Sequence, residues 1–187
     1  LECVAAVDED ALQGCRGRSG VEAMLLRMGQ AAADFYIANS AQDGIPYWDT
    51  GAPGLACMGD YLDRPAEPDN GYEPVDSSAA AIAAQGLLRL GRYVGLTKKV
   101  GKKYYQAGLT VARTLFDAPY LATDARHQGL ILHSVYHRPN GWDYVPRGKT
   151  VPQGESSMWG DYHLLELALL IKRMAESAAY PTFFISH

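Results

Sequence analysis

The sequence predicts an all-α fold built from paired helices, and three observations support this prediction. Four stretches carry apolar residues at helical spacing. The chain shows no convincing series of strands. Two long links, 40–75 and 118–155, alternate with a short one, which is typical of helical hairpins whose long loops gather at one end. We therefore expect the helices to be arranged as in an α/α toroid, within a single domain of 187 residues.

The first two predicted helices cover 21–39 and about Ser77 to Tyr93. Asp76 precedes the second helix and is expected to be its N-cap. The first half of that helix is almost entirely alanine, and such small side chains let another backbone or a ligand approach closely. The first helix carries one apolar stripe with spacings of three and four residues, made of Val21, Met24, Leu25, Met28, Ala32, Phe35 and Tyr36.

The third predicted helix runs from about Lys102 to Asp117, and the fourth begins after Gly154-Glu155-Ser156 and reaches about Ala175. A short strand is predicted within 130–137. The ends, 1–20 and 177–187, show no sustained period and receive no element. The third helix is expected to bury Tyr105, Leu109, Ala112, Leu115 and Phe116, and the fourth carries Met158, Trp159, Tyr162, Leu165 and Leu169.

Composition argues against several classes of partner. A net charge of −4 and a pI near 5.7 argue against nucleic acid or an anionic membrane. The sequence has no run of about 18 apolar residues, and its first residues do not resemble a signal peptide. Cys3, Cys15 and Cys57 are an odd number at unrelated spacings, so we expect free thiols in a reducing compartment and a cytoplasmic protein.

The two long loops are rich in Gly, Pro, Asp, Tyr and Trp, and loops of this length in a compact domain are more often functional than idle. Trp48 with Asp49, and Trp142 with Asp143, each place an aromatic ring beside a carboxylate. This pairing suits carbohydrate, because apolar sugar faces stack on rings while a carboxylate accepts hydroxyl groups. The alternative is that each Trp packs its loop onto the core. Both interpretations stay open.

Three motifs in order resemble the C-terminal part of the unsaturated glucuronyl hydrolases, glycoside hydrolase family 88. They are G-I-P-Y-W-D-T-G-A-P at 44–53, D-S-S-A-A-A-I-A-A-Q-G-L-L at 76–88, and W-G-D-Y-H-L-L-E at 159–166. L-I-L-H-S-V-Y-H-R-P-N, from residue 130, resembles the family's segment before its last inner helix. The resemblance covers roughly 21–175.

The resemblance implies an (α/α)₆ toroid, in which six outer helices surround six inner ones and the substrate lies over the inner N-terminal ends. In that fold the alanine face of 77–85 packs in the inner ring and Asp76 stands at the mouth. The family's W-S-R-G-Q-A-W segment and its catalytic aspartates precede the part that this chain resembles, and no W-S-R-G-Q-A-W occurs here. We therefore expect residues 1–187 to form an incomplete barrel, and we assign no catalytic residue.

The activity that the resemblance implies is hydration of the C4–C5 double bond of unsaturated glucuronyl oligosaccharides. An aspartic acid protonates the double bond and helps water add, so no metal or cofactor is implied. We expect the substrate rim to include Trp48, Asp49, Asp76, His133 and Trp142. His133 and His137 have the spacing of a helical metal pair, but Pro139 and the absence of H-E-x-x-H argue against zinc.

Two alternatives to this interpretation, the C-terminal part of a hydrolase, remain open. The chain could be a non-catalytic carbohydrate-binding or interaction module that keeps the rim without the chemistry. It could also be an inactive fragment that another chain completes. An incomplete toroid exposes inner helices such as 77–90, and exposed apolar surface favours self-association or a complementing chain.

Overall fold

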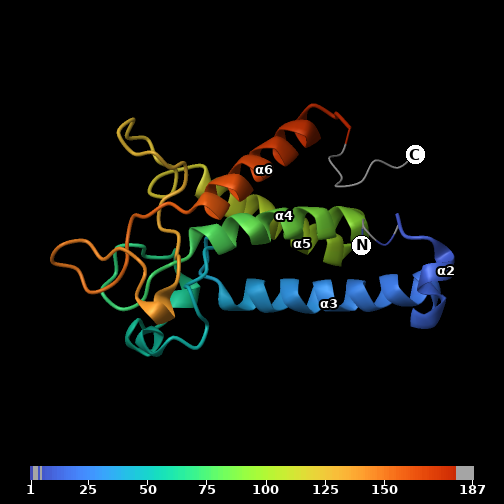
Figure 1. Cartoon of the computed structure of the whole chain (residues 1–187), viewed down its shortest axis with the longest axis horizontal. Coiled ribbons are helices and arrows are strands. Elements are labelled where there is room, and N and C mark those ends of the chain that lie inside the picture. The colour runs from blue at the N-terminus through green and yellow to red at the C-terminus, as the bar shows by residue number, and fades with distance from the viewer. Residues whose placement is uncertain (2–3, 5, 180–187) are drawn as a thin grey trace.

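Four long helices and a group of loops at one end make up the structure (Figure 1), a computed structural model that describes residues 1, 4 and 6–179. The long helices are α3 (Gly17–Asn39), α4 (Ser77–Val94), α5 (Lys99–Leu115) and α6 (Met158–Ala175). A one-turn helix, α2 (Glu9–Leu12), precedes them. Short 3₁₀ turns occupy Gln13–Cys15, Pro53–Cys57, Tyr61–Asp63 and Arg138–Asn140.

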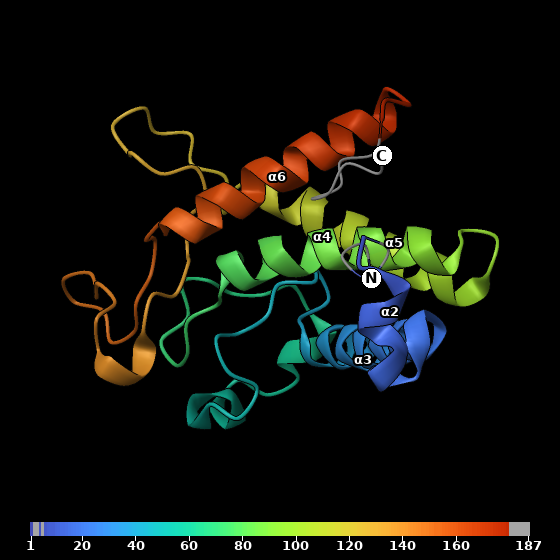
Figure 2. The same ribbon diagram turned by 45° about the vertical axis from the view of Figure 1, so that its right-hand side comes forward.

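Helix α4 is the centre of the arrangement, because it contacts α3, α5 and α6. Both views place α4 and α5 between α3 on one flank and α6 on the other (Figures 1 and 2). The long loops lie together at the end where α4 and α6 begin and where α3 and α5 end (Figure 1). The predicted all-α class and the gathering of the long loops are confirmed, and the described residues form no β-strand.

The alanines of α4 allow close contact between helices. Ala80, Ala81 and Ala84 are fully buried. Where α4 crosses α5, Gly91 also allows close contact. A Cβ added to Gly91 would lie 2.7 Å from the backbone nitrogen of Tyr105 and 2.8 Å from the backbone oxygen of Gly101. The sequence left open whether the small side chains let another backbone or a ligand approach. The structure shows the close approach of another backbone.

Both long loops are tied to each other and to the core. A single β-bridge joins Tyr47 to Val75, and a second joins Leu121 to Ile131. Between the loops, the Gln153 amide donates to the carbonyl oxygen of Asn70 at 2.8 Å. Several loop side chains enter the main hydrophobic core beside the helices: Ile45, Tyr47, Val75, Tyr120 and Ile131. The predicted strand within 130–137 is wrong, because the bridge at Ile131 does not extend into a ladder.

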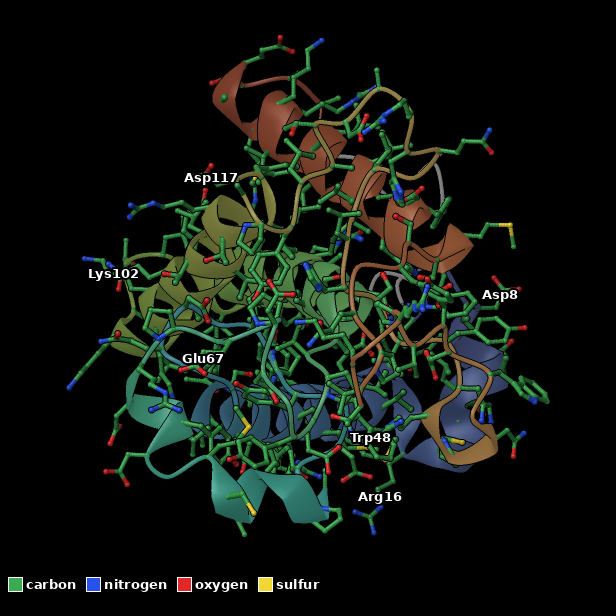
Figure 3. The ribbon with its side chains drawn as sticks, turned by 90° about the vertical axis from the view of Figure 1, so that its left-hand side faces the viewer. Asp8, Arg16, Trp48, Glu67, Lys102 and Asp117 are labelled. Carbon is green, nitrogen blue, oxygen red and sulfur yellow. The ribbon has the colours of Figure 1, made fainter. Side chains whose placement is uncertain are left out.

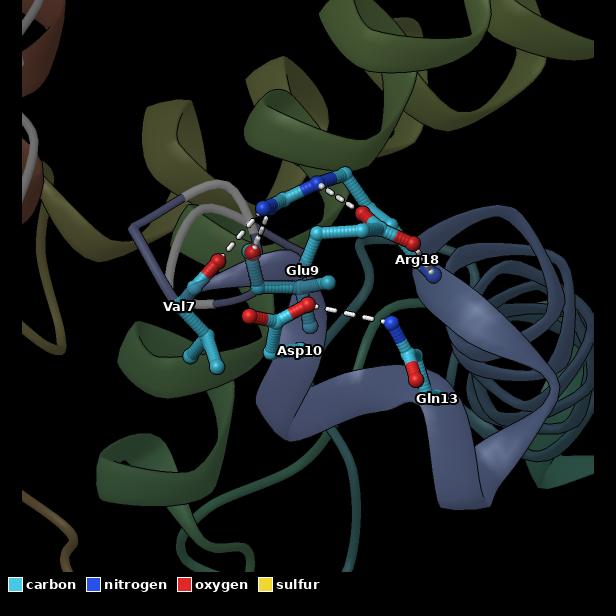
Figure 4. A network of polar contacts seen from close by, with 6 residues as sticks. Val7, Glu9, Asp10, Gln13 and Arg18 are labelled. Atoms are coloured by element: carbon cyan, nitrogen blue, oxygen red, sulfur yellow. Dashed lines mark hydrogen bonds and ion pairs between the residues drawn. The ribbon is translucent and has the colours of Figure 1, made fainter.

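The N-terminal segment folds back against the start of α3 (Figure 4). The guanidinium group of Arg18 donates to the carbonyl oxygens of Val4 and Val7, and its Nε lies 3.3 Å from a carboxylate oxygen of Glu9. The amide of Gln13 donates to Asp10 at 3.0 Å. The sequence predicted no helix or strand within 1–20, but part of this region forms α2. Helix α3 begins at Gly17 rather than near residue 21.

Much of two apolar patterns that the sequence assigned to helices does not face the core, although Tyr36 of the first pattern packs against it. On α3, Met24, Met28 and Phe35 are exposed, and the buried residue is Ala33. On α6, Leu165 and Leu169 are exposed, while the core side is made of Leu164, Leu167 and Leu170. The expected exposure of 77–90 is also wrong as a general statement, because eight of these fourteen residues are buried.

Several smaller expectations also have an outcome. Cys15 and Cys57 are free thiols, as predicted, whereas Cys3 lies outside the described residues, as does 180–187 of the unassigned C-terminal end. None of the helices in the described ranges combines the length and apolar character that crossing a bilayer requires. Leu109 of α5, expected to be buried, is 40% exposed.

The close contact of α4 with α5 can be tested with two glycines of the same helix. Gly91→Ala places a methyl group against two backbone atoms, so we expect a loss of about 1–3 kcal/mol of unfolding free energy despite the better helix propensity of alanine. Gly86→Ala is the matched control, because nothing lies within 4 Å of its added Cβ, and it should stabilise by about 0.5–1 kcal/mol. Urea unfolding measures both; equal effects would contradict the packing described here.

Candidate functional site

Asp76 begins α4 and connects both long loops to it. Its Oδ1 accepts hydrogen bonds from the backbone nitrogens of Ser78 (3.0 Å) and Ala79 (3.2 Å), which confirms the predicted N-cap. The same oxygen accepts from the Ser78 hydroxyl at 2.6 Å and from the backbone nitrogen of Val135 at 3.5 Å. Its backbone nitrogen donates to the carbonyl oxygen of Pro46 at 2.9 Å. Asp76 is therefore hydrogen-bonded both to Pro46 in the first long loop and to Val135 in the second.

His133 lies beside this cap and is buried. Its backbone oxygen accepts from the nitrogen of Ser77 at 3.1 Å, and its Nδ1 accepts from the nitrogen of Gly154 at 3.1 Å. Its ring meets the ring of Tyr120 edge-on, with centroids 5.9 Å apart. The backbone at His133 has φ 67°, in the left-handed region. Burial lowers the pKa of the His133 imidazole below its ordinary value.

An aromatic row leads from the exposed loop to the cap of α4. Trp142, which is 61% exposed, lies 5.9 Å from the ring of Tyr136, and Tyr136 stacks on Trp159 at 5.3 Å between centroids. The indole nitrogen of Trp159 donates to the hydroxyl oxygen of Ser78 at 3.1 Å, and that hydroxyl donates to Asp76. A continuous path of rings and polar groups thus joins Trp142 to Asp76.

Asp143 fixes the outer end of this row. Its carboxylate accepts from the backbone nitrogen of Tyr136 and, at 3.1 Å, from that of His137. The imidazole of His137 lies 4.9 Å from the ring of Trp142 and its Nδ1 accepts from the nitrogen of Asn140 at 3.3 Å. His133 and His137 do not share a helix, so their spacing has no metal-binding meaning here. The Trp-Asp pair at 142–143 is built as a turn that presents the indole ring.

Trp48 and Asp49 lie at the same loop end, and Figure 3, which looks onto that end, labels Trp48. The Trp48 indole nitrogen donates to Glu73 at 2.8 Å, and its ring packs against the core, as the alternative interpretation expected. Asp49 is exposed, and its Oδ1 accepts from the nitrogen of Gly51 at 2.7 Å. The backbone nitrogen of Trp48 donates to the carbonyl oxygen of Pro74 at 3.1 Å, which brings this segment to within two residues of Asp76.

A cavity of about 560 Å³ opens beside the start of α6. On one wall, His127 Nε2 lies 2.7 Å from the hydroxyl oxygen of Ser156, which donates to the carbonyl oxygen of Ile131 at 2.6 Å. Asp161 accepts from the backbone nitrogens of Leu130 and Ile131 at 2.9 and 3.0 Å, so it holds this wall to α6. The remaining lining comes from Gln128, Gly129, Tyr144, 153–155 and 157–158. Polar and apolar surface line this cavity in similar amounts, and it is large enough for one sugar unit or more.

The structure therefore brings some of the predicted site residues together and not others. Asp76 and His133 are adjacent through Ser77, and Trp142 reaches them through Tyr136 and Trp159. No contact within the described ranges joins Asp49 to that group. Sequence reasoning did not assign Tyr136 or His127 to the site, and only the aromatic content of the 118–155 loop pointed toward them.

No metal cluster of three or more His, Cys, Asp or Glu side chains occurs among the residues that the structure describes. Three carboxylates of the loop end, those of Asp143, Glu155 and Asp161, instead accept hydrogen bonds from backbone nitrogens. Glu155, for example, accepts from the nitrogen of Tyr144 at 3.0 Å. Their arrangement serves to order loops and to present hydrogen-bond acceptors.

Comparison with known proteins gives the family that this geometry resembles. No family model matches the chain. A curated protein of Bacillus sp. (strain GL1), named unsaturated glucuronyl hydrolase, is 28% identical over 149 residues, and another of that name from Formosa agariphila is 29% identical over 143 residues. The chain is similar to the unsaturated glucuronyl hydrolases. The resemblance predicted from its three motifs is confirmed.

Solved structures agree with this result. The crystal structure of the unsaturated glucuronyl hydrolase from Bacillus sp. GL1, described as responsible for the degradation of glycosaminoglycan, matches with a TM-score of 0.61 at 28% identity, over 81% of this chain and 34% of that one. An unsaturated glucuronyl hydrolase specific for heparin matches with a TM-score of 0.54 at 26% identity, over 78% of this chain and 32% of that one. The helices thus have the fold of part of an α/α toroid.

Each alignment covers a much larger share of this chain than of the relative. The alignments cover 80% and 75% of this chain but only 33% and 29% of the curated relatives. The chain therefore spans about a third of the length of the unsaturated glucuronyl hydrolases that it matches.

The environment of His133 predicts how stability depends on pH. Because burial lowers its folded pKa, the unfolded chain takes up a proton below the ordinary histidine pKa of about 6.5 while the folded chain stays neutral. Stability is therefore full above that pH and falls as the pH drops through the folded pKa, by at most about 1.4 kcal/mol per pH unit for one proton.

The variant His133→Asn isolates this effect, since asparagine tolerates the left-handed backbone and does not titrate in this range. We expect the stability difference between the parent chain and the variant to shrink as the pH falls from about 7.5 to about 5.5. Urea unfolding across that range is the measurement. A difference that stays constant would show that His133 is not held neutral by its burial.

Proposed function

We propose that this chain binds unsaturated glucuronyl oligosaccharides at its loop end, as the substrate-rim part of a hydrolase that hydrates the C4–C5 double bond. The observation that carries the proposal is the path from the exposed Trp142 through Tyr136 and Trp159 to Asp76. Similarity to unsaturated glucuronyl hydrolases supports the choice of substrate class. As a finer proposal, the protein acts in the cytoplasm.

The proposed roles follow from exposure and available hydrogen-bond capacity. Trp142 offers an exposed ring on which the apolar face of a sugar can stack. Asp76 caps α4 through Oδ1, and within the described part of the chain its Oδ2 has no hydrogen bond, so that oxygen can accept a sugar hydroxyl. His133 supports this position from beneath rather than by contact, because it is buried. Trp48 and Asp49 extend the rim along the neighbouring loop.

A second candidate function is a carbohydrate-binding module without turnover. It is favoured by the hydrogen bonds of the loop-end carboxylates, since Asp143, Glu155 and Asp161 each accept from at least one backbone nitrogen of a neighbouring loop. These three carboxylates order the loops, and each of them already accepts a hydrogen bond from the protein. General acid catalysis requires a positioned carboxyl group within reach of the reacting carbon.

Binding can be measured with an unsaturated glucuronyl disaccharide by calorimetry. We expect Trp142→Ala to weaken binding about tenfold, which corresponds to ~1.4 kcal/mol, because the exposed stacking ring is removed. Tyr93→Ala is the matched control, since Tyr93 is similarly exposed but lies at the far end of α4. Equal affinities for the two variants would remove the aromatic row from the binding site.

The carboxylate of Asp76 can be separated from its capping role. Asp76→Ser keeps an N-cap side chain, so the helix should lose well under about 1 kcal/mol of stability. We expect disaccharide affinity to fall severalfold, because the free Oδ2 acceptor is lost. Binding equal to that of the parent chain would restrict Asp76 to its structural role.

Turnover separates the two candidate functions. The double bond of the disaccharide absorbs in the ultraviolet and its hydrated product does not, so absorbance reports the reaction directly. Binding with steady loss of absorbance supports the hydrolase. Binding without loss supports the module, and no binding by a folded chain overturns both.

A further inference from the structure

A second cavity, of about 500 Å³, lies at the loop end, on the side where α3 and α5 end. Four segments form its walls: the turn after α3, the pair 65–66, the last two turns of α5, and 117–120 (Figure 3, where Asp117 is labelled). Among the described residues that line it, none belongs to the aromatic row from Trp142 to Asp76. The cavity is therefore separate from the surface that carries the proposed function.

Two carboxylates give this cavity hydrogen-bond acceptors. Asp43 is half-buried, and its two carboxylate oxygens accept from the backbone nitrogens of Ile45 and Ala66, each at 3.2 Å. Asp117 is exposed, and its Oδ1 accepts from the backbone nitrogen of Ala118 at 2.8 Å. Because each carboxylate oxygen can accept two hydrogen bonds, both side chains keep acceptor capacity for a ligand.

Other side chains of the lining add donors and further acceptors. Arg113 and Gln42 are exposed at the cavity and offer N–H donors. The hydroxyl groups of Thr110 and Thr114 donate to carbonyl oxygens of the protein at 3.1 and 2.9 Å, so toward a ligand they act as acceptors. A ligand that matches this lining must both donate and accept hydrogen bonds, as hydroxyl groups do.

Charge limits the class of ligand further. The cavity has two carboxylates and one guanidinium group, and it lies at the C-terminal end of α5, where the helix dipole is negative. An anionic sugar such as a uronate is therefore disfavoured. A metal ion is disfavoured as well, because no group of three or more His, Cys, Asp or Glu side chains lies together in the described part of the chain. An ammonium group would lie beside Arg113, so a neutral ligand fits best.

Tyr120 brings an unpaired hydroxyl group to this cavity. It lines the cavity but is only 1% exposed, so it lies at the floor. Within the described ranges, its hydroxyl is the one buried side-chain nitrogen or oxygen without a hydrogen-bond partner. Burial raises the pKa of this hydroxyl, and the nearby carboxylate of Asp43 raises it further. Because an unpaired buried hydroxyl costs free energy, a ligand that accepts from it gains affinity.

We propose that this cavity is a second carbohydrate site, which binds a neutral sugar unit. One sugar hydroxyl accepts from Tyr120 and donates to Asp43, while Arg113 and Asp117 bind neighbouring hydroxyl groups. A sugar hydroxyl can serve both neighbours at once, whereas a uronate carboxylate cannot donate and an ammonium group cannot accept. This site is additional to the proposed uronate-binding surface and does not depend on it.

The decisive variant is Tyr120→Phe, which removes only the hydroxyl group. Since this hydroxyl has no partner in the free protein, urea unfolding should show no loss of stability. The affinity for the bound sugar should fall about fivefold, because one hydrogen bond to the ligand is lost. The measurement is a titration of the ¹⁵N-labelled chain, followed by NMR, with glucose, galactose, mannose and N-acetylglucosamine. Signals of 42–43, 65–66 and 110–120 should shift.

Controls separate this site from the rim. Tyr93→Phe makes the same change at an exposed tyrosine at the far end of α4 and should leave the affinity unchanged. Arg113→Met, at an exposed position, should weaken binding severalfold. Trp142→Ala should have no effect on the neutral sugar, whether or not it affects the unsaturated disaccharide.

Several results would overturn the proposal. One is that none of the four sugars shifts these signals at its highest soluble concentration. Another is that glucuronate or glucosamine binds there more tightly than every neutral sugar, since the ligand class would then be wrong. Parent affinity in Tyr120→Phe would show that the hydroxyl does not meet the ligand. A loss of affinity in Trp142→Ala would place the neutral sugar at the rim instead.

Discussion

The contact of α4 with α5 is the constraint on which the rest of the structure depends. Gly91 and the alanines of α4 let the two backbones approach, and a single added methyl group at Gly91 would collide with backbone atoms that cannot move separately. With α5 held on one side, α4 can bury its other apolar residues against α6 and α3. The position of the N-terminal end of α4 is then fixed, and the loops must be built around it.

The N-cap residue of α4 fixes the two long loops relative to the helix. Orphan backbone nitrogens at the start of a helix require an acceptor, and Asp76 supplies it with one carboxylate oxygen. The backbone nitrogen of Asp76 donates a hydrogen bond to Pro46, and that of Ser77 donates one to His133. The segments before and after α4 therefore converge where the helix begins. A residue that is needed for folding therefore lies where a ligand could meet it, and capping through one oxygen leaves the other for that second role.

Helices were predictable from local pattern, whereas their environment was not. The cap at Asp76, the alanine face and the position of α6 are encoded within a few residues, and the structure contains them. The burial of an apolar stripe depends instead on what covers it, and periodicity gives no information on that. Met28 and Leu165 have the spacing of core residues but face outward. The stacking of Tyr136 on Trp159 was not predictable either, because it joins a loop to the first turn of α6 and only the folded chain defines their relative position.

The outward-facing apolar residues of α3 and α6 and the gathering of the long loops at one end follow from one feature of the fold. Consecutive helices of a hairpin array alternate in direction, so every long loop emerges at the same end and every flank has apolar rows for the next hairpin. Among the described residues the loop end is ordered by Asp76, Asp143 and Asp161, which accept hydrogen bonds from backbone nitrogens. The loop end is therefore organised within one copy, because its hydrogen bonds are internal to it.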